Sequence, residues 1–283
     1  MPQSSFSQPV SALARKRVSC RTFQPGGLEP PVLERLLLAL EQVAPPFATP
    51  LRPRFIDREK VKADHLFSSG TYGLISGVRH FLTAPLPLDS LRNGEDLGFL
   101  LETAVLHLTD WGIGSCWIGG VFDRKRFGGQ IGLGERETLP VVIAIGKAAD
   151  HRSLRERLSR WSAKGDQRKP FSQLFFAESF DRPLGDEQAG PALPALECLR
   201  RAPSASNKQP WRLVRQGEQY HLFLCHDPTY RKFFPYLQRI DMGIAMAHFQ
   251  LAAQEAGLPG SWREGPAPAI DLPQDTCFVA TWR

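Results

Sequence analysis

Hydrophobic positions along this chain fall into two patterns, a helical spacing and short continuous apolar runs. An amphipathic helix is predicted over 28–43, where leucines recur at helical spacing after a pair of prolines: Leu33, Leu36, Leu37 and Leu40. Continuous apolar runs predict strands over 78–84, 140–146 and 276–282. The stretch 193–200 predicts a further helix, and the residues after Trp211 predict a β-hairpin.

Two further helices are apolar around most of their circumference, which predicts that they are buried on all sides. The first begins at Asp96-x-Gly98 and ends at Gly112, and the second begins at Asp241-x-Gly243 and ends at Gly257. Sixteen residues separate the aspartate from the terminal glycine in both cases. Because helices and strands recur around them in the same order, the chain is predicted to contain an internal repeat.

Composition places the chain among soluble globular proteins. It has 283 residues, 42% of them hydrophobic, enough for one large core or two moderate ones. The N-terminus lacks the basic segment and following apolar run of a signal peptide, and no window is apolar enough to span a membrane. We therefore expect a cytoplasmic protein without a membrane partner. Its five cysteines lie far apart without a C-x-x-C pair, which indicates neither a disulfide framework nor a metal site.

The net charge of +6 is concentrated in one segment. Eight lysines and arginines lie between Lys147 and Lys169. Such a run can bind nucleic acid, but aromatic residues do not interleave with it and no nucleic-acid module accompanies it, so we expect no nucleic-acid partner. An anionic small ligand explains part of the run, and a solvated basic face is an alternative for the rest.

A second cluster of charge lies near the N-terminus. Arg17, Ser19 and Arg21 alternate, so an extended backbone would point all three side chains to one side. Two guanidinium groups and a hydroxyl converging there suit a phosphate or the polar edge of a flavin. The alternative is a solvated basic turn.

Polar loop chemistry is concentrated in the segment 201–211. Ser204, Ser206 and Asn207 have short side chains that hold turn or cap geometry and leave backbone amides free, while prolines at 203 and 210 stiffen both ends. The segment could hold a flat polar ligand. It could equally be a surface loop whose Trp211 fills the core.

Glycines cluster in the segment 112–120, Gly-Ile-Gly-Ser-Cys-Trp-Ile-Gly-Gly. A dinucleotide-binding fingerprint would require glycine where Trp117 stands and a strand before the motif, so that reading fails. Glycines without a Cβ allow a backbone to approach a ring face closely. A glycine-rich connector between a helix and a strand is the alternative.

Together these segments resemble the motifs of the nitroreductase family of flavin enzymes, and Arg168-Lys169-Pro170 resembles the family's basic element. The resemblance implies an α+β fold of the nitroreductase type with FMN as cofactor. It implies that Arg17, Ser19 and Arg21 bind the phosphate and the ring edge of FMN. It also implies that Arg168 and Lys169, from later in the chain, bind the same phosphate. After Ile118, an amide of Gly119 or Gly120 would point at flavin N5. The loop against the ring and ribityl chain would be formed by Pro203, Ser204, Ala205, Ser206, Asn207 and Gln209.

In the family, one subunit of a dimer binds the phosphate and the other contributes this loop. The internal repeat can therefore be compared with the two subunits. The first half contains a copy of the loop at 44–50, but Pro46 and Thr49 or Pro50 stand at its serine and asparagine positions. The second half has no counterpart of the basic cluster around Arg17. The resemblance therefore implies a fused dimer, with halves 10–171 and 172–283 related by a pseudo-two-fold axis, one FMN site, and a monomer that suffices.

The resemblance also implies an activity. FMN would pass hydride from NADH or NADPH to a small organic acceptor such as a nitroaromatic or a quinone, in a ping-pong cycle. No side chain is assigned as a catalytic acid. A flavin-binding or flavin-sensing protein without catalysis is the main alternative, and a nucleic-acid-binding protein is the third.

Overall fold

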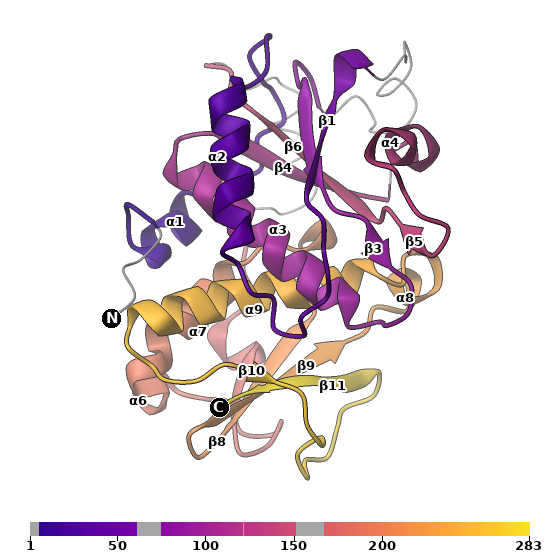
Figure 1. The fold of residues 1–283 in the computed structure, drawn as a ribbon. Coiled ribbons are helices and arrows are strands. Elements are labelled where there is room, and N and C mark those ends of the chain that lie inside the picture. The colour runs from indigo at the N-terminus through magenta and orange to yellow at the C-terminus, as the bar shows by residue number, and fades with distance from the viewer. Residues whose placement is uncertain (1–5, 61–74, 121, 151–166) are drawn as a thin grey trace.

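The computed structural model describes residues 6–60, 75–120, 122–150 and 167–283. Two sheets lie at opposite ends of the molecule, and helices pack between them (Figure 1). The first sheet is antiparallel in the order β1 (Arg54–Asp57), β2 (His80–Thr83), β6 (Val141–Gly146) and β4 (Gly114–Gly119). The second has the order β10 (Trp262–Arg263), β11 (Thr276–Trp282), β9 (Gln219–Cys225), β8 (Trp211–Gln216) and β7 (Phe175–Ala177), with β7 and β8 parallel. A short pair, β3 (Leu86–Pro87) and β5 (Glu137–Thr138), lies beside the first sheet.

The longer helices are α2 (Pro30–Glu41), α3 (Asn93–Asp110), α7 (Leu193–Arg201) and α9 (Leu237–Glu255). Shorter ones are α1 (Val10–Lys16), α4 (Arg124–Ile131), α6 (Asp186–Ala189) and α8 (Pro228–Phe233). Every helix and strand predicted from the apolar pattern is present, with ends displaced by a few residues. The segment 112–120, which resembles a glycine-rich turn, is instead mostly the strand β4, and left-handed glycines at 112 and 120 flank it.

The centre of the molecule is the crossing of α3 and α9 (Figure 1). Every residue of α3 from Asn93 to Thr109 is buried, as the apolar circumference of the helix predicts. The crossing is close because each helix has a glycine at the contact. A Cβ on Gly98 would lie 2.1 Å from the carbonyl oxygen of Ile240, and a Cβ on Gly243 would lie 1.8 Å from that of Glu95. The two Asp-x-Gly motifs of the repeat therefore meet each other at the interface between the halves.

Polar groups also join the two central helices. Glu95 of α3 pairs with Arg239 of α9 at 2.7 Å. Glu102 of α3 lies between His248 of α9, at 2.9 Å, and the indole of Trp117, which donates to it at 2.7 Å. These side chains form hydrogen bonds between the two helices. The pairing of the halves therefore depends on these polar contacts in addition to the buried apolar surface.

The N-terminal segment crosses from one half to the other. Helix α1 packs against α7 and α9, although its sequence position places it in the first half. The amide of Val10 donates to the carboxylate of Glu255 at the end of α9, while the amide and hydroxyl of Ser7 donate to Asp110 at the end of α3. The first described residues thus bind the ends of both central helices.

Among the helices that the structure describes, none combines the length and apolarity needed to cross a membrane. All five cysteines are free thiols, and three of them are buried as small apolar groups: Cys20, Cys116 and Cys198. Most of the basic segment predicted as an anion-binding arm, residues 151–166, lies outside the described residues.

Candidate functional site

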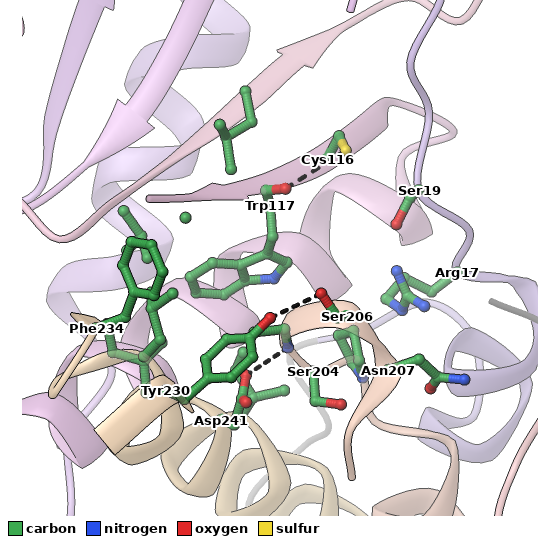
Figure 2. A pocket seen from close by; sticks show the side chains of 18 of the residues that line it. Arg17, Ser19, Cys116, Trp117, Ser204, Ser206, Asn207, Tyr230, Phe234 and Asp241 are labelled. Carbon is green, nitrogen blue, oxygen red and sulfur yellow. Dashed lines mark hydrogen bonds between the residues drawn. The ribbon is translucent and has the colours of Figure 1, made fainter. Parts of the chain in front are cut away.

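A pocket of about 500 Å³ lies between the halves and contains most of the residues selected from the sequence. Most of its wall comes from the N-terminal segment 17–21, strand β4, the loop 203–207, and the region from α8 into α9, and Ile75, Val141 and Arg168 complete it. Figure 2 shows Arg17 and Ser19 on one side of this pocket, with Tyr230 and Phe234 on the other.

One end of the pocket is cationic. Arg17, Ser19 and Arg21 all line it, as alternating positions of an extended segment should. The segment is extended because Ser19 forms a bridge to Ser115 beside β4, and the amide of Cys20 donates to the Ser115 carbonyl at 2.8 Å. Nη1 of Arg21 is buried and has no hydrogen-bond partner among the described residues.

The arm that follows residue 166 reaches the same end. Arg168 lines the pocket, and its guanidinium donates to the carbonyl of Arg201 at 3.1 Å and to Oδ1 of Asn207 at 3.4 Å. Lys169 does not line the pocket. Its amide donates to Oε1 of Gln209 at 2.8 Å, and burial lowers the pKa of its ammonium group. Lys169 therefore ties the arm to the loop from outside the pocket.

The loop after α7 forms another wall of the pocket, lined by Pro203, Ser204, Ala205, Ser206 and Asn207. Its backbone turns sharply, because Ser206, Asn207 and Gln209 all have left-handed φ values, between 46° and 54°. Side chains maintain this turn: Oγ of Ser204 accepts from the amide of Gln209 at 2.9 Å, and the Gln209 amide group donates to Asn207. Gln209 is buried beneath the loop and does not line the pocket.

The other end of the pocket is apolar and aromatic, lined by Trp117, Ile118, Gly119, Tyr230, Phe234, Leu237, Ile240 and Ile244. Tyr230 donates its hydroxyl to Oγ of Ser206 at 2.7 Å, which joins α8 to the loop across the pocket (Figure 2). Gly120 is not part of the wall, because the ring of Phe234 covers it: a Cβ on Gly120 would lie 2.9 Å from that ring. Of the two glycines selected from the sequence, Gly119 is the one that reaches the pocket.

Sequence reasoning missed the residues from α8 and α9. Tyr230 and Phe234 are four residues apart, a spacing equally typical of core positions. Asp241 was selected only as a landmark of the repeat, and it also lines the pocket. The one signal in the sequence that could have identified this wall was Asp241, an acidic residue in the first turns of a mostly apolar helix.

The sequence from residue 10 to residue 253 matches a family model described as "Putative TM nitroreductase". The chain belongs to this nitroreductase family. A crystal structure of a putative nitroreductase from Thermotoga maritima is similar over 97% of this chain and 92% of its own, with a TM-score of 0.58 and 18% identity.

Other nitroreductases are similar to part of this chain. A nitroreductase family protein from Clostridium difficile covers 59% of the chain and 95% of its own length, with a TM-score of 0.45 and 21% identity. An FMN- and NADPH-dependent nitroreductase from a Sphingopyxis strain covers 51% of this chain and 90% of its own, with a TM-score of 0.42 and 17% identity. A search of curated proteins finds no match.

Within this nitroreductase-family chain, the two copies of the loop can be compared position by position. Phe47 and Ala205 each donate a backbone amide to the aspartate of a central helix, Asp96 or Asp241, at 2.9 Å. The next residue is left-handed in both loops, Ala48 at 57° and Ser206 at 46°. This correspondence places Pro46 opposite Ser204 and Thr49 opposite Asn207. The first loop therefore shares this turn with the second but lacks the serine and the asparagine, and Thr49 has no left-handed φ to match that of Asn207.

Proposed function

We propose that this chain binds one FMN in the pocket between its halves and reduces a small organic acceptor with electrons from NADH or NADPH. The observation that carries the proposal is the division of the pocket, with three guanidinium groups at one end and an aromatic, apolar wall at the other. Membership of the nitroreductase family supports a general oxidoreductase function.

The residues present fit FMN. The volume of about 500 Å³ lies within the range of small-molecule sites. The buried Arg21 Nη1 has no hydrogen-bond partner in the part of the chain that the structure describes, and a phosphate oxygen is an acceptor that suits a guanidinium group. A planar ring system suits the apolar end, where Trp117, Tyr230 and Phe234 line the wall. Glycine at position 119 leaves room there for Leu237, because a Cβ would lie 2.8 Å from that side chain.

Each wall has a distinct part in this proposal. Arg17, Ser19, Arg21 and Arg168 would hold the phosphate. Ile118 and Gly119 would face the ring from β4, and the loop 203–207 would lie against the ring and ribityl chain. Bound FMN supplies the hydride chemistry. The protein contributes orientation, positive charge and exclusion of water from the apolar end.

One observation favours the second candidate, a flavin-binding protein without turnover. The hydrogen bond from Tyr230 to Ser206 and the contact of Phe234 with Gly120 restrict the space on one side of the pocket. If these side chains stay in place over bound flavin, a nicotinamide has no room to stack.

The absorbance spectrum of the FMN-loaded protein separates the two functions. Anaerobic addition of NADH or NADPH should bleach the flavin absorbance within seconds, and addition of a quinone should restore it. Flavin that binds but stays oxidised would favour the binding protein. No binding of FMN at all would contradict both functions.

A further inference from the structure

The carboxyl group of Asp241 is the one acid in the pocket wall, as the described residues define it. Its side chain is 3% exposed. The amide of Ala205 donates to Oδ1 at 2.9 Å, while Oδ2 is buried and has no hydrogen-bond partner among the described residues. Figure 2 shows this carboxyl group on the same side of the pocket as Tyr230, away from Arg17 and Ser19.

The equivalent residue of the first half has no such free oxygen. Asp96 accepts from the amide of Phe47 at Oδ1 and from the amide of Thr49 at Oδ2, at 2.9 and 2.8 Å. In the second loop the amide of Asn207, which corresponds to that of Thr49, donates instead to the carbonyl of Ser204. The same aspartate thus closes its loop with two hydrogen bonds in one half and with one in the other. The oxygen released in the second half is buried, and it belongs to a residue that lines the pocket.

The surroundings of Asp241 keep this carboxyl group neutral. Burial raises its pKa to about 8, and the hydrogen bond from Ala205 opposes that rise only in part. No ion pair involves Asp241 within the described part of the chain. The charged or titratable groups that share the pocket or the adjoining helix contact are Arg17, Arg21, Arg168, Cys116, Tyr230 and the pair Glu95 and Arg239.

Resting on the proposed function, we propose that Asp241 is the catalytic acid that protonates the acceptor during its reduction. Oδ1 keeps the group in place through Ala205, and Oδ2 is the oxygen left to carry the proton. A carboxylic acid held neutral by an apolar site can serve as a proton donor near pH 7. The acceptor class that this arrangement favours has an oxygen that must be protonated, such as a quinone carbonyl.

The step balances for a quinone. A quinone needs a hydride, which carries two electrons and one proton, and bound FMN would supply it. The O–H bond of Asp241 breaks, and its proton passes to the quinone oxygen, which completes a hydroquinone. Asp241 is left as a carboxylate and regains its proton from water when the product leaves.

The substitution Asp241→Asn tests this step, because an asparagine carbonyl still accepts from Ala205 but cannot release a proton. With menadione as acceptor, kcat should fall by about 100-fold. Turnover with ferricyanide, which accepts one electron without a proton, and anaerobic reduction of bound FMN by NADPH should each stay within about twofold. Asp96→Asn is the comparison variant in the other half: it loses one of two loop hydrogen bonds, but Asp96 does not line the pocket, so the ratio of menadione to ferricyanide turnover should stay that of the wild type.

A measurement without cofactor provides an independent readout. In the FMN-free protein labelled with ¹³C at aspartate carboxyl carbons, one resonance should titrate near pH 8, and it should be absent from Asp241→Asn. In the wild type, kcat with menadione should fall as pH rises through this range, because the acid form is lost, whereas the variant should show no such decline.

Three results would overturn the proposal. Equal menadione turnover in wild type and Asp241→Asn would show that another group supplies the proton. An equal loss with ferricyanide would mean that Asp241 only maintains the loop. Failure of the wild type to bind FMN, established first by titration, would remove the proposed function and the acid together, whereas the first two results leave the proposed function standing.

Discussion

Arg21 shows how little a single side chain reveals until its neighbours are known. In the sequence it is one of several basic residues near the N-terminus, and Arg15 is another. In the structure Arg15 is exposed and donates to Ser11, whereas Arg21 lines the pocket and is half-buried, and its Nη1 has no hydrogen-bond partner within the described ranges. A buried donor without an acceptor is unfavourable by about 1–3 kcal/mol unless a ligand completes it.

The substitution Arg21→Ala should therefore weaken FMN binding by about 1.5–3 kcal/mol, the range for a lost hydrogen bond to a charged group. Arg15→Ala removes the same charge from the same segment without touching the pocket, so its effect on binding should be below about 0.5 kcal/mol. Titration of flavin fluorescence gives both dissociation constants. Equal dissociation constants for the two variants would remove Arg21 from the site.

Pocket residues were predictable from the sequence where charged or polar side chains recur with the period of a strand. The alternation of Arg17, Ser19 and Arg21 indicated that an extended backbone would point all three side chains to one side, and all three line the pocket. Tyr230 and Asp241 were not predictable as pocket residues, because neither spacing nor composition distinguishes a pocket aromatic from a core aromatic, or a capping aspartate from a catalytic one. That distinction depends on which hydrogen bonds are left unmade, and only the folded arrangement shows it.

The principal element of this molecule is the helix pair α3 and α9. Their apolar circumference and the repeated Asp-x-Gly motif predicted two buried central helices. The reciprocal contact, with Gly98 against Ile240 and Gly243 against Glu95, was not predictable from one sequence. It depends on the crossing of two segments about 145 residues apart, a long-range contact that local patterns do not encode.

Adding one methyl group at this crossing should separate the helices. Gly243→Ala places a Cβ 1.8 Å from a backbone oxygen that cannot move independently of α3, so we expect a loss of about 3 kcal/mol or more in the free energy of unfolding. Gly129→Ala in α4 meets open space and should change stability by no more than about 1 kcal/mol, in the stabilising direction. Denaturant titration compares the two, and similar midpoints would contradict the close crossing.

At the scale of the whole molecule, the two copies of the loop differ in the charge of the pocket beside them: three arginines line the pocket beside the 203–207 loop. The pocket beside the 44–50 loop is about 310 Å³, and its charged lining groups are Glu41 and Arg54. The negative charge of Glu41 offsets the positive charge of Arg54, so this pocket lacks the net positive charge that a phosphate dianion requires. The fused-dimer layout was predictable from complementary losses in the sequence, whereas the crossing of α1 onto the second half was not.

The stoichiometry should follow this asymmetry. We expect one FMN per chain, bound by a monomer, because the surface that pairs subunits in a dimer is here buried between halves. Flavin absorbance against protein concentration, combined with sedimentation of the loaded protein, measures both quantities. Two flavins per chain, or binding that disappears when the protein is diluted, would contradict this expectation.

The two aspartates of the repeat differ by a single hydrogen bond, and this difference has an evolutionary consequence. In an assembly of identical chains, one codon specifies both copies of a position, so a change that frees an oxygen for chemistry in one copy frees it in the other. Here separate codons specify Asp96 and Asp241. A substitution at one position therefore leaves the other unchanged, so the two hydrogen bonds of Asp96 and the single hydrogen bond of Asp241 can be selected independently.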